Sequence, residues 1–217
     1  RFKCDWSSDV CSSDLLANHD IMACAQTGSG KTVAFLFPLF LKYATGTIVS
    51  VRAMKLQHKQ NAASNSNFDQ GNSRMNSQFV GYKPFDVNNE SVDPLTGKFA
   101  PSALILSPTR ELASQIYNEC AKFSYRSPLR AVVIYGGKQQ QNQISELRKG
   151  VDILIATPGR LIDYLQQGLI TLRKVAYLVC DEADRMLDMG FEPQIRAIVM
   201  GHDMPAHGSN SQPNTPY

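Results

Sequence analysis

Long hydrophobic runs are missing from this sequence of 217 residues. No apolar stretch approaches the ~18 residues that a membrane-spanning helix requires, and the N-terminus lacks the continuous apolar segment of a signal peptide. An excess of one charge is missing too, because 22 Lys and Arg stand against 19 Asp and Glu, for a net charge of +3. This mild charge permits a nucleic-acid surface without arguing for one. The length suits one globular domain rather than two.

Cysteine is also scarce, with five residues, an odd number. Cys24 and Cys180 lie inside apolar, strand-like runs, where cysteine behaves as a small buried hydrophobic residue. This distribution argues against a disulfide framework and favours a reducing, intracellular compartment.

Short apolar runs alternate with helical patterns along most of the chain. The runs cover residues 20–25, 103–108, 130–136, 152–157 and 177–184, and the helical patterns cover 31–43, 110–124, 139–149, 159–167 and 185–199. This order predicts an α/β fold with a parallel sheet covered by helices on both faces. Because the runs are apolar throughout, the strands should be buried on both sides. Ligands of such sheets bind beyond the carboxyl ends of the strands, where the polar motifs of this sequence fall.

Two stretches interrupt the alternation. Residues 45–99 are rich in Asn, Ser and Gln and have weak periodicity, which predicts a disordered insertion. Residues 204–217 are rich in Pro, Ser and Asn and lack a core pattern, so we expect an unstructured tail. The domain itself should span residues 16–203.

The stretch "AQTGSGKT" follows an apolar run and opens a helical pattern, which is the context of a phosphate-binding P-loop. Its glycines allow a tight turn that points backbone N–H groups at phosphate oxygens. Lys31 would reach the outer phosphates, and the Thr32 hydroxyl would ligate Mg²⁺. Ala25 stands where the pattern normally has glycine, and the alternative is a glycine-rich turn with a surface lysine. We predict that ATP is bound by Ala25, Gln26, Thr27, Gly28, Ser29, Gly30, Lys31 and Thr32.

The stretch "VCDEAD" places two adjacent carboxylates at the end of an apolar run, which is costly unless they have partners or a function. Asp181 would help to hold Mg²⁺, through water, and Glu182 would orient or deprotonate the water that attacks the γ-phosphate. The alternative is a capping cluster in which Asp184 is the N-cap of the next helix. We predict that Glu182, Lys31 and Asp181 are catalytic, and that Thr32 and Asp181 serve the metal.

The P-loop and the DEAD tetrapeptide together resemble the DEAD-box RNA helicases. Further stretches match the family in order: "PTRELA" at 108–113, the pair Gly136–Gly137, "TPGR" at 157–160 and "DEADRMLDMGFEPQI" at 181–195. The stretches "KFSYRS", "VVIYGG" and "VRAMK" resemble the Vasa and Belle group. The resemblance covers residues 16–208 apart from most of the insertion.

The resemblance implies the first RecA-like lobe of a two-lobe motor that uses ATP and Mg²⁺ and grips the RNA backbone. Threonine hydroxyls and arginine forks suit phosphate, and such contacts are non-specific and sensitive to salt. For Arg110 the alternative is an ion pair with Glu111 or Glu119. We expect the protein to be located in the cytoplasm, with the nucleus or ribonucleoprotein granules as alternatives. We expect no membrane partner. The residues expected to bind RNA are Pro108, Thr109, Arg110, Gly136, Gly137, Thr157, Pro158, Gly159 and Arg160.

The sequence departs from the family in three places. The adenine-reading glutamine expected near Ser7 or Ser8 is absent, as are the strand with the Ser-Ala-Thr motif and the second lobe with its arginine fingers. That strand lies between the P-loop strand and the DEAD strand, so its loss should leave unpaired backbone groups on both flanks. We expect the parent protein to be an ATP-dependent RNA helicase and this piece to show little ATPase activity. The alternatives are a non-hydrolysing RNA- or protein-binding scaffold and another P-loop NTPase.

The opening "RFKCDWSSDVCSSDL" has no counterpart in the family pattern. A zinc site needs about four ligands, and Cys4, Cys11 and His19 supply three. A Cys4–Cys11 disulfide conflicts with a reducing compartment, and a flexible acidic leader is the ordinary alternative. The stretch resembles the translation of a short-read sequencing adapter, since TGC-TCT-TCC-GAT-CT encodes its last five residues. We expect residues 1–15 to be non-native.

Amplification of the transcript from RNA tests this expectation. We expect the codons for residues 1–15 to be missing from the product and the glutamine element to stand in their place. An amplified transcript that contains these codons would show that the segment belongs to the protein.

Overall fold

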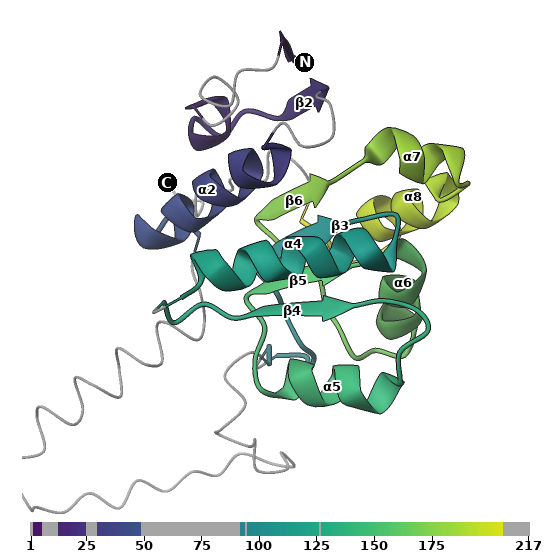
Figure 1. The fold of residues 1–217 in the computed structure, drawn as a ribbon. Coiled ribbons are helices and arrows are strands. Elements are labelled where there is room, and N and C mark those ends of the chain that lie inside the picture. The colour runs from purple at the N-terminus through teal and green to yellow at the C-terminus, as the bar shows by residue number, and fades with distance from the viewer. Residues whose placement is uncertain are drawn as a thin grey trace, which may run out of the picture.

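Four strands form one parallel sheet in the computed structural model, which describes residues 2–5, 13–24, 30–48, 92–93, 95–125 and 127–205. Its order is β4-β5-β3-β6 (Figure 1), and every neighbouring pair is parallel. The α/β prediction is therefore confirmed. The strands are β3 (Ala103–Leu106), β4 (Ala131–Ile134), β5 (Ile153–Ala156) and β6 (Tyr177–Cys180).

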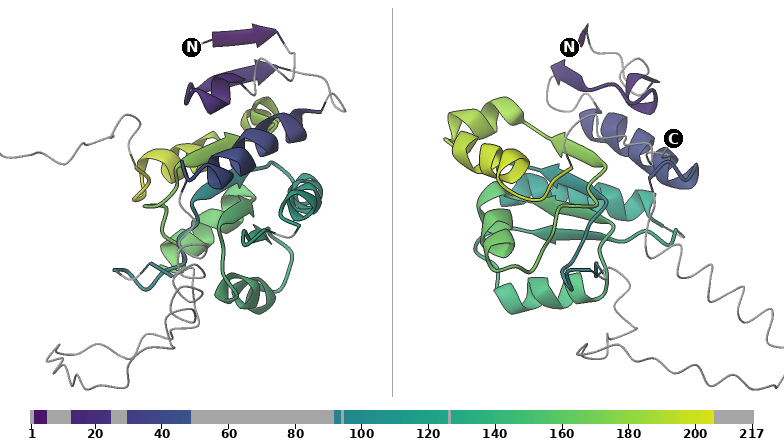
Figure 2. Two further views of the ribbon diagram at one scale, coloured as in Figure 1. Left: turned by 90° about the vertical axis from the view of Figure 1, so that its left-hand side faces the viewer. Right: turned by 180° about the vertical axis from the view of Figure 1, so that it is seen from behind.

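Helices cover both faces of this sheet, as the sequence predicts. Figure 2 shows α6 and α8 on the face opposite α4. Among the described residues, no helix is long and apolar enough to cross a membrane. The helices are α2 (Lys31–Ala44), α4 (Arg110–Phe123), α5 (Gln140–Arg148), α6 (Pro158–Gln166), α7 (Ala183–Asp188) and α8 (Glu192–Met200).

The side chains of β3 divide the hydrophobic core into two parts, because successive residues of a strand point to opposite faces. Leu104 and Leu106 pack with residues of α5, α6 and α8. Ala103 and Ile105 pack with residues of α2 and α4 on the other face. All four β3 side chains are fully buried, as are those of β5, so β3 and β5 are the two inner strands of the sheet.

The strand before the P-loop does not join this sheet. Strand β2 (Ile21–Cys24) pairs in parallel with β1 (Phe2–Asp5) in a separate two-stranded sheet (Figure 2). Within the described residues, β6 pairs only with β3, and Leu178 on β6 is 38% exposed. The outer edge of β6 is therefore unpaired among the described residues, on the side where the sequence predicts a gap. Strand β1 lies within residues 1–15, which the sequence predicts to be non-native. Its pairing with β2 leaves that prediction untested, because an unpaired strand edge accepts extended segments readily.

Three local expectations are wrong. Cys24 is exposed, because β2 has no place in the main sheet. The helix predicted over 185–199 is divided into α7 and α8, because Gly190 adopts a left-handed φ of 77° and Pro193 lies in the first turn of α8. Both ends of the predicted insertion belong to the fold.

Those ends pack against the domain. The buried residues at these ends are Ile48, Val92 and Phe99. The backbone of Phe99 forms isolated β-bridges with Val92 and with Ile170. Met204, the first residue of the predicted tail, packs against the core. Residues 49–91 and 206–217, which make up most of the predicted insertion and tail, lie outside the described residues.

The buried sheet makes a direct prediction about stability. Leu154 on β5 is fully buried, whereas Leu95 is 76% exposed. Leu154→Ala should lower the free energy of unfolding by about 2–5 kcal/mol, because it removes buried methyl groups and leaves a cavity. Leu95→Ala, the same change at the surface, should alter it by less than about 0.5 kcal/mol. Denaturant titration measures both, and equal losses would contradict the assigned core.

Candidate nucleotide and RNA site

The carboxyl ends of β3, β4, β5 and β6 meet at one edge of the sheet and lead into the predicted motifs. Residues Pro108 to Arg110 follow β3, Gly136 and Gly137 follow β4, and residues 157–160 follow β5. Asp181 and Glu182 follow β6. Parallel pairing thus places all of these segments at one edge of the sheet, where α/β sheets bind their ligands.

Only part of the predicted P-loop lies within the residues that the structure describes. Gly30 is the N-cap of α2 and has a left-handed φ of 84°, a conformation that favours glycine. Lys31 and Thr32 form the start of that helix and are half-buried. Their expected contacts with ATP and Mg²⁺ stay predictions. The remaining P-loop residues, Ala25, Gln26, Thr27, Gly28 and Ser29, lie outside the described residues.

Asp181 lies at the end of the β3–β6 ladder, where its backbone N–H donates to the Leu106 carbonyl over 2.9 Å. Burial raises the pKa of the Asp181 carboxyl, the charge of Glu182 raises it further, and the charge of Lys31 opposes both. A partly buried carboxylate with an acidic neighbour is stabilised by a cation. The surroundings of Asp181 therefore fit the predicted Mg²⁺ role.

Glu182 has a left-handed backbone, with φ 51° and ψ 50°. This conformation is uncommon for residues other than glycine, and strained residues of this kind cluster at active sites and ligand clamps. Arg185 Nη1 donates to Glu182 Oε2 over 3.1 Å. The alternative in which Asp184 caps the helix is wrong, because α7 begins at Ala183 with Glu182 at the N-cap position.

The three segments expected to bind RNA approach one another. A Cβ added to Gly137 would lie 3.6 Å from Arg110 Nη1. Arg160 donates from Nε to the Tyr135 carbonyl over 3.3 Å and from Nη2 to the Lys138 carbonyl over 3.4 Å. These contacts join the loops after β3, β4 and β5 into one surface.

Two helices begin at this surface, and a helix N-terminus favours anions. Thr109 caps α4, and its hydroxyl accepts from the Leu112 N–H over 3.3 Å. Thr157 is the N-cap residue of α6 but makes no side-chain capping bond. Pro108 and Pro158 are buried, whereas Gly136 and Gly159 are exposed. The exposed glycine backbone and the threonine hydroxyls are suited to contact a phosphate chain.

Arg110 also makes the ion pair that the sequence offers as an alternative. Its Nε lies 2.6 Å from Glu111 Oε1, and the two side chains are 65% and 63% exposed. Glu119 instead pairs with Lys122. An exposed pair of this kind contributes about 0–1 kcal/mol, so Arg110 can leave Glu111 for a phosphate at little cost.

Sequence reasoning missed the residues that hold the loop after β4. Gln143 on α5 is buried and accepts from the Tyr135 N–H and donates to the Tyr135 carbonyl, each over 3.0 Å. Its position in a polar helical segment gives no sign of this contact, which depends on how α5 packs beside β4. Among the described residues, no group of three His, Cys, Asp or Glu side chains could hold a metal ion.

Comparison with known proteins shows the family of this chain. The model of the DEAD/DEAH box helicase family matches residues 9–211. This chain belongs to the DEAD/DEAH box helicase family. It is similar to a probable ATP-dependent RNA helicase ddx3 of Dictyostelium discoideum, with 47% identity over 191 residues. That match covers 88% of this chain and 22% of the relative, so the helicase domain described here spans about a fifth of the relative's length.

Solved structures share the fold. The yeast DEAD-box splicing factor Prp28 is 33% identical, with a TM-score of 0.58, over 83% of this chain and 32% of that protein. A hypothetical ATP-dependent RNA helicase from Sulfolobus tokodaii is 24% identical, with a TM-score of 0.59, over 88% of this chain and 40% of that protein. The second likeness concerns the fold alone.

The capping bond of Thr109 makes a second prediction. Thr109→Ala should lower the free energy of unfolding by about 0.5–2 kcal/mol, because the Leu112 N–H loses its acceptor. Thr109→Ser retains the hydroxyl and should stay within a few tenths of a kcal/mol of the original stability. Denaturant titration of both variants checks this, and a Thr109→Ala protein as stable as the original would show that the cap contributes nothing.

Proposed function

We propose that the full-length protein containing this chain is an ATP-dependent RNA helicase that hydrolyses ATP to open short RNA duplexes. The observation that carries the proposal is the convergence at one sheet edge of the Asp181–Glu182 pair and three segments suited to phosphate, with Lys31 at the start of α2 near enough for its charge to act on Asp181. The names of the DEAD-box relatives support the same activity.

ATP would lie between the start of α2 and the end of β6. Lys31 would bind its outer phosphates, and Glu182 would accept the proton of the attacking water as the new oxygen–phosphorus bond forms and the bond from the γ-phosphorus to the β–γ bridging oxygen breaks, so that ADP leaves. Thr32 and, through water, Asp181 would hold Mg²⁺, which supplies positive charge to the phosphates when bound. Charge repulsion between Asp181 and Glu182, together with burial, supports a cation at this position.

RNA would lie across the loops that follow β3, β4 and β5. Its backbone would meet the hydroxyls of Thr109 and Thr157 and the guanidinium of Arg110, while Arg160 holds the glycine turn in shape. Contacts of this kind read phosphate positions rather than bases. We therefore propose RNA binding that is independent of sequence and weakens steeply with salt.

Several finer assignments belong to the same proposal. The stretches "KFSYRS" and "VVIYGG", together with the ddx3 relative, support membership of the Vasa and Belle group. The full-length protein would supply a second lobe and a strand between β2 and β6, and residues 1–15 would be foreign. Its location would be the cytoplasm, with the nucleus or ribonucleoprotein granules as alternatives. Without the second lobe, this chain alone should not unwind RNA.

Turnover of ATP by the full-length protein tests the role of Glu182. Glu182→Gln should lower RNA-stimulated turnover by about 10²–10⁴-fold, because the amide cannot accept the proton of the attacking water, while ATP binding remains. Glu192→Gln makes the same change at an exposed residue of α8 that pairs with Arg196 and should leave turnover unchanged. Turnover unaffected by Glu182→Gln would refute the assigned role.

A further inference from the structure

Strand β4 has an outer edge that no strand of the described residues covers. Its inner edge faces β5, where the carbonyls of Arg130 and Ile134 accept from Ile153 and Thr157 N–H groups, each over 3.1 Å. Backbone groups of alternate residues point to opposite sides of a strand. The N–H and C=O groups of Ala131 and Val133 therefore point outward, away from the sheet.

The next outward-facing residue already has an amide partner. Tyr135 exchanges two hydrogen bonds with the Gln143 side chain, which is 1% exposed. A strand residue paired with Tyr135 would make the same two bonds. Gln143 thus closes one end of the edge and leaves Ala131 and Val133 as the open positions.

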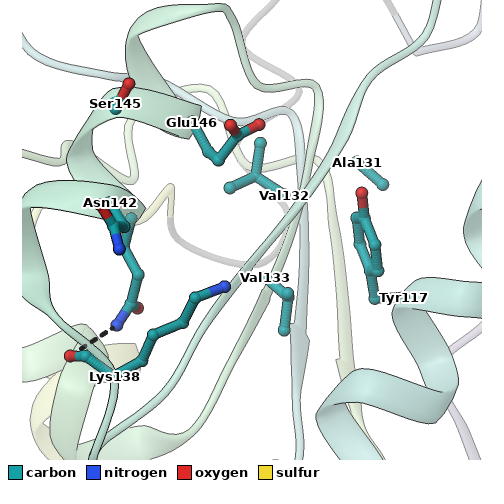
Figure 3. A pocket seen from close by; sticks show the side chains of 9 residues that line it. Tyr117, Ala131, Val132, Val133, Lys138, Asn142, Ser145 and Glu146 are labelled. Atoms are coloured by element: carbon teal, nitrogen blue, oxygen red, sulfur yellow. Dashed lines mark hydrogen bonds between the residues drawn. The ribbon is translucent and has the colours of Figure 1, made fainter.

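A hollow of about 380 Å³ runs along these open positions, between α4 and α5. Its size falls within the range of ligand-binding sites. Figure 3 shows Tyr117 of α4 on one side, and Glu146 of α5 and Lys138 on the other. An extended chain entering the hollow would meet polar side chains on one face and the Tyr117 ring on the other.

The charges in and beside the hollow sum to a positive value, because Arg130, Lys138 and Lys149 surround one carboxylate, Glu146. Glu146 is paired with Arg130 and Lys149, each over 2.6 Å. Lys138 has no ion pair among the described residues, and its ammonium lies 5.8 Å from the centre of the Tyr135 ring. An occupant that carries a carboxylate on the α5 side would complement Lys138.

We propose that the outer edge of β4 and the hollow beside it bind an acidic, extended peptide segment of a partner protein, which adds a strand to the sheet. This interaction surface goes beyond the helicase activity. It uses backbone groups in the middle of β4 rather than the motifs at the carboxyl ends. RNA fits the hollow less well, because its phosphates only accept hydrogen bonds, whereas the edge of β4 offers N–H donors and C=O acceptors in alternation, which a peptide strand matches.

The test uses the full-length protein and a fluorescein-labelled peptide, acetyl-Thr-Glu-Val-Glu-Val-Glu-Thr-amide. Binding should slow hydrogen exchange at the Ala131 and Val133 amides. Val133→Pro should weaken binding at least tenfold, because proline removes an outward N–H. The ladder to β5 uses Val132 and Ile134, so this variant should keep the fold, which circular dichroism checks. Proline is tolerated at such edge positions.

Two further arms remain informative if Val133→Pro does not fold. The peptide with N-methyl groups on its three central amides should bind at least tenfold more weakly, because it cannot donate to the edge. Lys138→Gln should weaken binding of the acidic peptide several-fold. The proposal would be overturned if the N-methylated peptide bound as tightly as the original peptide. It would also be overturned if the original peptide left hydrogen exchange at the Ala131 and Val133 amides unchanged. If oligouridylate slowed hydrogen exchange at those two amides and the peptide had no effect, the hollow would be an RNA site and the proposal would be overturned as well.

Discussion

The parallel hydrogen-bonded ladder on β3 is the constraint on which the rest of this domain depends. β3 lies between β5 and β6, and its side chains are buried on both faces. Because neighbouring strands run in the same direction, their carboxyl ends reach one edge together. Segments far apart in the sequence, from Pro108 to Glu182, thereby become neighbours. A shift of one strand by a single residue would bury the wrong side chains, so the core that fixes the register also fixes the site.

Residues of the candidate RNA surface have structural partners as well as expected RNA contacts. Thr109 caps α4, Arg160 holds the carbonyls of Tyr135 and Lys138, and Arg110 pairs with Glu111. The exposed Arg110 pair is the easiest to exchange for a phosphate, because water already weakens it. The Arg160 bonds instead shape the glycine turn. Substitutions at Arg110 and Arg160 therefore probe different things, the first a proposed phosphate contact and the second the shape of the loop.

Apolar runs predicted the strands of the main sheet, because strands buried on both faces must be apolar throughout. Apart from the P-loop, each motif follows the carboxyl end of a strand of this sheet in the sequence, so parallel strands place these motifs at the same edge of the sheet. The break at Gly190 has a signal in the sequence, since Pro193 follows this glycine closely and both residues disfavour a continuous helix. The exposure of Cys24 and the pairing of Gln143 with Tyr135 had none, because both depend on which segments pack side by side. Local sequence thus predicts elements and motifs, and tertiary placement decides partners.

Hydrogen exchange of the full-length protein, with and without oligouridylate and a non-hydrolysable ATP analogue, most directly tests whether the carboxyl edge of the sheet is the RNA surface. Amides at the starts of α4 and α6 and in the turn from Gly136 to Lys138 should exchange more slowly when both ligands are present. Amides of α5 and of β4 at Ala131 and Val133 should not change. Slower exchange on α5 or α8, with the three motif segments unaffected, would contradict this account of the site.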